Sequence, residues 1–224
     1  MFGQIATRYD FLNHFLSFGV DYYWRRRATR LAPPVGDGPL LDVCTGTGDL
    51  ALAYWRAGGK RLHVVAADFC HEMLVVGRKK VERAGAGSNV SLIEADSERL
   101  PFDNDRFQVV SVAFGLRNLS DLRCGLGELV RVCRPGGRVV VLEFSMPIFR
   151  PFRAVYGWYF RKVLPKLGQA LAKNRLDAYN YLPESVQEFP QGEVLVERMA
   201  DAGLSSMRHY PLTFGVATLY VGVK

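Results

Sequence analysis

The feature that most restricts the fold of this chain is a series of short, almost continuous apolar runs. Strand-length runs occur at residues 39–44, 62–68, 90–96, 107–114 and 138–144. They are hydrophobic throughout rather than at every second residue, which is typical of parallel strands covered on both faces. Helix-like stretches lie between most of them. The pattern predicts an α/β fold with a doubly wound, mostly parallel sheet.

Further elements are expected between these runs and at both ends of the chain. Helices are predicted at residues 48–57, 71–84, 121–133 and 193–202. The third of these has Ser120 as its expected N-cap and stops before the Pro135-Gly136-Gly137 turn. The alternating tail after residue 203 predicts two antiparallel strands, which bring the sheet to seven.

The chain is predicted to be a single domain over residues 1–224, with two additions to the sheet. Residues 1–31 are expected to form helices with an aromatic face, placed as an N-terminal lid. Residues 147–190 form a basic, aromatic insertion between the fifth strand and the last long helix. Neither low-complexity linkers nor internal repeats divide the chain.

Composition narrows the class of protein. Of the 224 residues 49% are hydrophobic, enough to bury a core and to exclude a disordered chain. The four cysteines are irregularly spaced and form no Cys-x-x-Cys pair, so neither a disulfide framework nor a metal site is predicted. No apolar segment reaches the about 18 residues of a bilayer-spanning helix, and Arg8 and Asp10 interrupt any signal sequence. We expect a cytoplasmic protein.

A glycine-rich loop directly follows the first predicted strand. Within D-V-C-T-G-T-G-D-L-A, Gly46 and Gly48 let the backbone turn at the edge where doubly wound sheets bind ligands. Asp68 ends the second strand, where a carboxylate accepts hydrogen bonds from both ribose hydroxyls. The two features predict a site for an adenosine-containing ligand. Asp96, after the third strand, is placed either to contact adenine or simply to act as a cap.

S-adenosylmethionine is favoured over NAD as that ligand, although residues 46–51 also fit the dinucleotide pattern G-x-G-x-x-A. The first strand begins about forty residues into the chain, later than is usual in dinucleotide domains. Asp49 opposes a pyrophosphate, whereas Asp42 and Asp49 on either side of the loop suit a positive sulfonium. The Tyr-x-x-x-Lys pair of dehydrogenases occurs only at Tyr220 and Lys224.

Several longer segments point to one family. They are MFGQIATRYDFLNHFLSFGVDYYWRRR, LLDVCTGTGDLAL, ADFCHEML, EADSERLPF, AFGLRN, LVRVCRPGGRVVVLEFSMP and YNYLPESVQEFP. The chain resembles the ubiquinone/menaquinone biosynthesis C-methyltransferases over its whole length. RYDFLN, FGLRN, LEFS and YLPES lie outside the core that methyltransferases in general share, so the resemblance is specific.

The resemblance implies both a reaction and a set of site residues. The reaction is methyl transfer from S-adenosylmethionine to a ring carbon of a prenylated quinol. Demethylmenaquinol is the favoured substrate, and 2-methoxy-6-polyprenyl-benzoquinol is the alternative. The implied and predicted cofactor-binding residues are Asp42, Gly46, Thr47, Gly48, Asp68, Asp96, Ser97 and Ala113. Cys44 stands where other methyltransferases have a glycine, and the contacts of Ser97 and Ala113 are expected through the main chain.

Carbon methylation of a quinol requires a phenolate, which pushes electron density onto the adjacent ring carbon. Arg117 and Asn118 follow the fourth strand and are expected beside the cofactor. The guanidinium of Arg117 stays protonated and lowers the pKa of the quinol hydroxyl. A structural ion pair with a nearby acid is the alternative role for Arg117.

Residues near the N-terminus supply further candidates for the catalytic site. Tyr9 and Asp10 in RYDFLN are predicted to close the site, with Tyr9 as a hydrogen-bonding group and Asp10 as a base. His14 and Glu143 are alternative bases. His14 among phenylalanines is more typical of a packed core residue.

The insertion at residues 147–190 predicts contact with a membrane. Six aromatic side chains between Phe149 and Phe160 lie among its seven basic residues, and no acidic residue occurs between Phe144 and Leu176. Because a prenylated quinol is too apolar to diffuse freely, its enzyme is expected at an anionic membrane surface, on the inner face of the cell membrane. Lid packing with solvated charges is the alternative.

Two other classes of protein are weighed against this one. The net charge of +7 with interleaved aromatics also fits an RNA methyltransferase, but the chain lacks an RNA-binding module and an Asn-Pro-Pro-Tyr motif. No nucleic-acid partner is therefore predicted. A non-catalytic scaffold that binds S-adenosylmethionine is disfavoured because Asp68, Arg117 and Asn118 are intact. A homodimer is the assembly left open.

Overall fold

The computed structural model describes residues 19–147, 149, 151, 153 and 185–224. The helices are α2 (Val20–Leu31), α3 (Asp49–Ala57), α4 (His71–Arg83), the short 3₁₀ helix η2 (Leu116–Asn118), α5 (Leu122–Val132), α9 (Glu193–Asp201) and the 3₁₀ turn η4 (Thr213–Gly215). The strands are β1 (Leu40–Val43), β2 (Val64–Asp68), β3 (Val90–Glu94), β4 (Phe107–Ala113), β5 (Cys133–Phe144), β6 (Ser205–Leu212) and β7 (Ala217–Val223).

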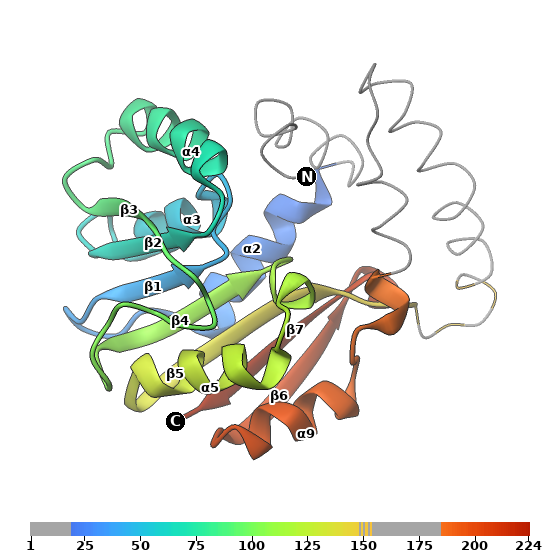
Figure 1. The fold of residues 1–224 in the computed structure, drawn as a ribbon. Helices are drawn as coiled ribbons and strands as arrows, with labels where there is room; N and C mark the ends of the chain where they lie inside the picture. The colour runs from blue at the N-terminus through green and yellow to red at the C-terminus, as the bar shows by residue number, and fades with distance from the viewer. Residues whose placement is uncertain (1–18, 148, 150, 152, 154–184) are drawn as a thin grey trace.

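These strands form one seven-stranded sheet in the order β3-β2-β1-β4-β5-β7-β6 (Figure 1). The first five strands are parallel, and β7 lies antiparallel between β5 and β6. The strand order reverses at β1, whose neighbours are β2 and β4. In open α/β sheets such a reversal places the ligand site outside the carboxyl ends of the strands. The predicted fold class is therefore confirmed, including the antiparallel C-terminal strands.

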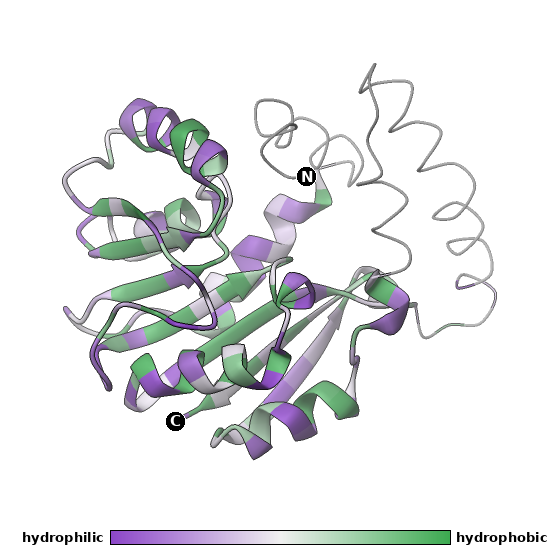
Figure 2. Ribbon diagram, in the orientation of Figure 1, coloured by the Kyte–Doolittle hydropathy of each residue, from purple (hydrophilic) through white to green (hydrophobic). Residues whose placement is uncertain are grey.

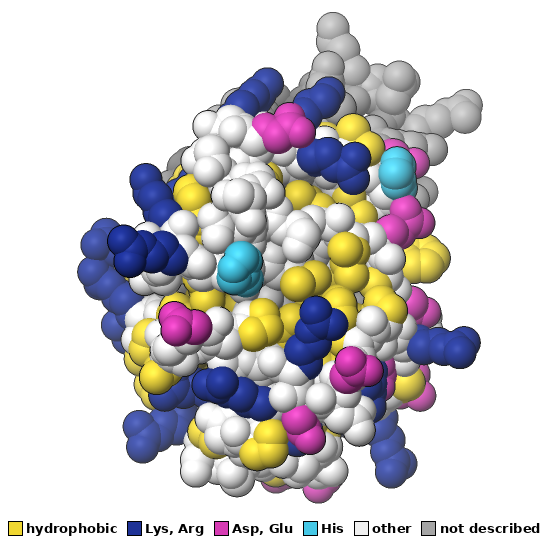
Figure 3. All heavy atoms as spheres, turned by 90° about the vertical axis from the view of Figure 1, so that its left-hand side faces the viewer, with side chains coloured by type: hydrophobic (Ala, Val, Ile, Leu, Met, Phe, Trp, Pro, Cys, Tyr) yellow, Lys and Arg dark blue, Asp and Glu magenta, His cyan; other side chains and the backbone are white. Residues whose placement is uncertain are grey.

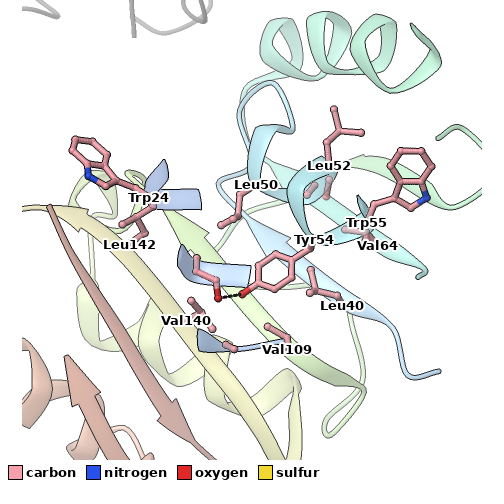
Figure 4. Close-up of a cluster of buried hydrophobic side chains, with 14 of the residues drawn as sticks. Trp24, Leu40, Leu50, Leu52, Tyr54, Trp55, Val64, Val109, Val140 and Leu142 are labelled. Carbon is pink, nitrogen blue, oxygen red and sulfur yellow. Dashed lines mark hydrogen bonds between the residues drawn. The ribbon is translucent and has the colours of Figure 1, made fainter. Parts of the chain in front are cut away.

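Two apolar layers cover the faces of the sheet. One layer joins α2, α3 and α4 to strand residues such as Leu40, Val109 and Val140. Figure 4 shows this cluster, in which the Tyr54 hydroxyl donates to the backbone carbonyl of Ala28 at 3.5 Å. The other layer packs α5 and α9 against the opposite face. The central strands are predominantly hydrophobic, whereas the edge strand β6 and the helices also carry hydrophilic residues (Figure 2).

Helix α5 and strand β5 differ from the sequence-based expectation at their ends. The N-cap of α5 is Asp121, whose carboxylate accepts from the backbone N–H of Cys124 at 3.0 Å. The prediction of Ser120 was wrong because Glu98 binds the N–H groups of both Ser120 and Asp121, which shifts the first turn. The Pro135-Gly136-Gly137 segment lies inside β5, where Gly136 hydrogen-bonds the carbonyl of Lys224.

The outer surface carries charged and apolar groups side by side. Figure 3 shows the face at the β3 edge, where Lys, Arg, Asp and Glu side chains lie around an area with many hydrophobic side chains. Within the described residues, no helix has the length and apolar character that crossing a membrane requires. The predicted insertion at residues 147–190 and the lid at residues 1–31 fall largely outside the described part.

Candidate active site

The glycine loop after β1 has the backbone conformation that its glycines predict. Gly46 and Gly48 adopt left-handed φ angles of 57° and 84°. A Cβ added at either glycine would meet nothing within 4 Å, so open space lies beside the backbone at both. Gly48 is also the N-cap of α3, whose first N–H groups lie next to the loop. The loop is thus shaped to receive a ligand close to its main chain.

Asp68 joins this loop to the end of β2. One carboxylate oxygen accepts from the N–H of Gly46 at 2.7 Å, and the other accepts from the N–H of Cys70 at 2.8 Å. Burial raises the pKa of the Asp68 carboxyl, and these N–H donors oppose the rise. Each oxygen has a second lone-pair site, so the carboxylate still has the capacity to accept from ribose hydroxyls.

Asp42 lies beneath the loop. It is 1% exposed, and its two oxygens accept from the hydroxyls of Thr45 and Ser111, both at 2.6 Å. Burial raises the pKa of Asp42 from 3.8 to about 6. These contacts make Asp42 a support that links the loop after β1 to the middle of β4.

Asp49 is paired with cations. Its carboxylate is 2.5 Å from Nζ of Lys80 and 3.5 Å from Nη2 of Arg25. Lys80 also donates to the Thr47 hydroxyl at 3.1 Å, and Arg25 also pairs with Asp21. The sequence did not indicate these cationic partners of Asp49, and the expectation that Asp42 and Asp49 suit a sulfonium stays a prediction. The cations come from α2 and α4, and no local sequence pattern predicts that these helices lie next to the loop.

Asp96 and Ser97 follow β3 at the same edge of the sheet. The exposed Asp96 carboxylate accepts from the N–H of Glu98 at 2.9 Å. This bond closes a turn, because the fully described segment between β3 and β4 contains no helix, so the helix-cap alternative is wrong. Ser97 is 5% exposed, and its hydroxyl lies 3.2 Å from the sulfur of Cys44. A direct Asp96 contact with adenine therefore remains a prediction.

Cys44 is the point of closest approach between the two sides of the site. It has a left-handed φ of 51°, and a Cβ built on Gly115 would lie only 2.3 Å from the Cys44 Cβ. Burial, together with the carboxylates of Asp68 and Asp42, raises the pKa of the thiol to about 12. Cys44 is consequently a neutral packing residue at physiological pH rather than a nucleophile.

A buried ion pair stands at the ends of β4 and β5. Nη1 of Arg117 is 2.9 Å from a carboxylate oxygen of Glu143, and the two side chains are 7% and 2% exposed. The same Nη1 donates to the backbone carbonyl of Phe114. Nε of Arg117 is buried and has no hydrogen-bond partner within the described part of the chain. The ion pair anticipated as an alternative role for Arg117 is present, and it leaves a donor unused.

Aromatic rings surround this pair. Phe114 directly follows Ala113, has a φ of 58°, and stacks on Phe144 at a centroid distance of 4.4 Å. Trp24 of α2 lies 5.8 Å from Phe114 and 6.0 Å from Phe144. The guanidinium carbon of Arg117 lies 5.5 Å from the Phe144 ring centroid. The three rings thus form an aromatic cluster beside the ion pair, which suits a planar hydrophobic substrate.

The remaining predicted residues divide into two groups. Asn118 is exposed and ends η2 next to Arg117, while Thr47 is buried under the loop. Tyr9, Asp10 and His14 lie outside the described residues.

Sequence reasoning missed several contributors to the site. Phe69 follows Asp68 and is 76% exposed at the edge where the ligand is expected. A large aromatic residue directly after Asp68, the predicted ribose-binding residue, is a sequence signal that could have identified it. Trp24, Lys80 and Ser111 arrive through long-range contacts that leave no such signal.

The fold and the site define a class I S-adenosylmethionine-dependent methyltransferase. The open glycine loop, the carboxylate at the end of β2 and the strand reversal at β1 fit that cofactor. The whole chain, residues 1–224, matches the ubiE/COQ5 methyltransferase family, and the chain belongs to that family. It is therefore an S-adenosylmethionine-dependent C-methyltransferase.

Comparisons with individual proteins agree. The chain is 51% identical to the demethylmenaquinone methyltransferase of Thermus thermophilus over 99% of each chain. It is 45% identical to the ubiquinone/menaquinone biosynthesis C-methyltransferase UbiE of a Geobacter species, over 100% of this chain and 94% of that protein. A chain in the complex between the Haloferax volcanii Trm112 methyltransferase activator and a methyltransferase superposes with a TM-score of 0.71, covering 100% of this chain and 97% of that one at 18% identity. This last likeness concerns the fold alone.

Proposed function

We propose that this protein methylates a ring carbon of a prenylated quinol and that demethylmenaquinol is its substrate. The observation that carries the proposal is Arg117, a buried guanidinium with an unused Nε donor at the apolar end of the sheet. An oxyanion is the group that such a donor stabilises best. The 51% identity to the demethylmenaquinone methyltransferase of Thermus thermophilus supports the naphthoquinol, rather than the benzoquinol, as the substrate of this chain.

Two sets of residues divide the work. When bound, S-adenosylmethionine supplies the methyl group as an electrophile. The glycine loop would hold it by main-chain contacts and Asp68 by hydrogen bonds to the ribose, for which the open space at Gly46 and Gly48 and the remaining acceptor sites of Asp68 leave room. Arg117 donates to the quinol oxygen and favours its ionised form, while the released proton passes to water. The rings of Phe114, Phe144 and Trp24 exclude water from the reacting carbon.

An assay with a labelled methyl donor tests this function. The purified protein is offered demethylmenaquinol, a 2-methoxy-6-polyprenyl-benzoquinol and bulk tRNA in parallel. Label in the naphthoquinol is expected to exceed label in the benzoquinol. More label in the benzoquinol than in the naphthoquinol would indicate a role in ubiquinone biosynthesis instead. Label in RNA alone would overturn the quinol assignment altogether.

We also propose peripheral contact with an anionic membrane surface, supported by the basic, aromatic composition of residues 147–190. Cosedimentation with vesicles of phosphatidylglycerol and phosphatidylcholine is expected, and vesicles of phosphatidylcholine alone should bind less protein. Equal binding to both would argue against an electrostatic contribution. The homodimer remains a prediction that sedimentation velocity checks.

A further inference from the structure

Glu143 is the most buried acid at this end of the site, and it is surrounded by donors. It is 1% exposed and precedes Phe144, the last residue of β5. Its carboxylate accepts from Nη1 of Arg117 at 2.9 Å, from the N–H of Arg117 at 3.3 Å and from the N–H of Phe144 at 3.2 Å. Both oxygens of the Glu143 carboxylate therefore accept hydrogen bonds from the protein itself.

These contacts fix the orientation of the Arg117 guanidinium. Nη1 donates to Glu143 and to the carbonyl of Phe114, and the Phe144 ring lies 5.5 Å from the guanidinium carbon. Because the guanidinium is planar, fixing one nitrogen on two acceptors fixes the directions of the others. Nε is the donor left buried without a partner among the described residues. A buried unused donor is costly unless a ligand completes it.

We propose that Glu143 is a positioning residue for methyl transfer, which holds Arg117 so that its unused donor binds the quinol oxygen. The proposal rests on the proposed function. Because Glu143 and Arg117 carry opposite charges, the pair is neutral as a whole. Arg117 therefore acts on the substrate as an oriented hydrogen-bond donor rather than as an unpaired cation.

The same contacts argue against Glu143 as the general base. To accept a proton, its carboxylate would lose its negative charge and leave the buried guanidinium of Arg117 without its counter-charge, which is unfavourable. Within the described ranges, the other titratable groups that interact with Glu143 are Cys44 from the loop after β1 and Tyr220 from β7. Burial raises the pKa of both groups, so they stay neutral and do not take over the charge of Glu143.

Replacement of Glu143 by Gln separates the two roles. The amide oxygen still accepts from Arg117, so the guanidinium keeps its orientation. The buried positive charge is then uncompensated, which lowers the free energy of unfolding but favours the phenolate when the quinol is bound. Turnover of demethylmenaquinol by Glu143→Gln should stay within about tenfold of wild type, and the rate should rise at lower pH than in wild type. A loss of a hundredfold or more at every pH, in a folded variant, would overturn the proposal and make Glu143 the base.

Binding of 1-naphthol, an unreactive phenol, gives a readout without turnover. Its ionisation is followed by absorbance in the presence of S-adenosylhomocysteine. Half-ionisation of the bound naphthol should fall to lower pH in Glu143→Gln than in wild type, and should rise in Arg117→Leu. Identical ionisation in all three proteins would contradict the positioning role.

Two further variants guard against misfolding and general charge effects. Glu143→Asp keeps the charge but shortens the side chain, so turnover should fall about tenfold without a shift of the pH profile; unchanged turnover would contradict positioning. The matched control is Glu94→Gln at the end of β3, an exposed acid paired with His71, which should leave the profile unchanged.

Wild-type protein that methylates none of the quinols would overturn the proposed function and the positioning role with it. Active wild type with a failing Glu143→Gln overturns the positioning role alone.

Discussion

The two sides of the strand-end site are built in different ways. On the side of β1 to β3, the loop is held by backbone N–H groups and short side chains, as in the bonds from Gly46 and Cys70 to Asp68. On the side of β4, β5 and β7, aromatic rings enclose one buried ion pair, Arg117 with Glu143. The first side offers main-chain polarity to a polar cofactor. The second offers aromatic rings and one oriented hydrogen-bond donor. Binding and chemistry are therefore expected to be separable by mutation.

The largest effect is expected from Arg117→Leu. If the guanidinium stabilises a phenolate that forms fully only on the way to methyl transfer, its loss lowers turnover more than binding. Turnover should fall by about two orders of magnitude or more, while calorimetry shows nearly unchanged affinity for S-adenosylmethionine. Raising the pH should restore part of the rate, because the quinol then ionises without help.

Arg117→Lys serves as the companion variant. It keeps the charge but loses the planar fork, so part of the activity should survive. Parallel loss of turnover, cofactor affinity and thermal stability in Arg117→Leu would show instead that the ion pair is structural. The two sides of the site would then not be separable.

The contact between the two sides is tested at Gly115. A methyl group there would lie 2.3 Å from the Cβ of Cys44, so Gly115→Ala should reduce the free energy of unfolding by about 2 kcal/mol. Cys44→Gly removes that Cβ and suits the left-handed φ of 51°, so the double variant should recover most of the loss. Urea unfolding of the four proteins completes the cycle. Additive effects would mean that the two loops relax independently.

Asp68→Ala should weaken binding of S-adenosylmethionine about tenfold or more, because it removes acceptors for the ribose hydroxyls, each bond being worth about 1.5–3 kcal/mol. It also frees the N–H of Gly46, so part of the loss comes from the loop itself. Asp68→Asn, which retains one carbonyl oxygen, should bind with intermediate affinity. Calorimetry that gives wild-type affinity for a folded Asp68→Ala would remove the ribose role.

The smallest effect concerns Asp42 and pH. Burial raises its pKa from 3.8 to about 6, so the folded state holds a proton that the unfolded state has released between these values. Stability attributable to Asp42 therefore falls as the pH rises from about 4 to 6, by at most about 3 kcal/mol. Asp42→Asn avoids this cost but must rearrange the bonds to Thr45 and Ser111, so a net gain of about 1 kcal/mol is expected at pH 7.

Thermal or urea unfolding at pH 4.5 and pH 7 measures this difference. The gain from Asp42→Asn should be larger at pH 7 than at pH 4.5. A loss of stability that is equal at both pH values would mean that Asp42 is not protonated in the folded state at low pH.

The two sides of the site also differ in how well the sequence predicts them. The glycine loop and Asp68 were predicted because a few adjacent residues determine them, and a left-handed φ at Gly46 and Gly48 is a local property. The pairing of Asp49 with Lys80 and Arg25 was missed, because those residues come from α4 and α2. The partner of Arg117 could be named only as some nearby acid, since Glu143 lies 26 residues further along the chain.

Strand ends show the same limit on a smaller scale. The apolar run at 138–144 was recognised, but β5 begins already at Cys133. The backbone groups of Gly136 and Gly137 hydrogen-bond to the backbone of Lys224, which extends the strand through a segment typical of turns. The hydrophobic pattern of the sequence does not indicate these bonds. The shift of the α5 N-cap to Asp121 likewise depends on Glu98, a residue from another loop.

The central position of β1 also bears on how the molecule folds. Its neighbour β4 is distant in the chain, and Asp42 meets Ser111 across 69 residues. Closing so long a segment costs chain entropy before any contact repays it, which makes parallel pairing slow. The N–H of Thr45 at the start of the glycine loop bonds the carbonyl of Ala67, so the loop is anchored only once β1 and β2 have paired. Refolding followed by hydrogen exchange should thus show loop amides becoming protected in the same late step as the centre of the sheet.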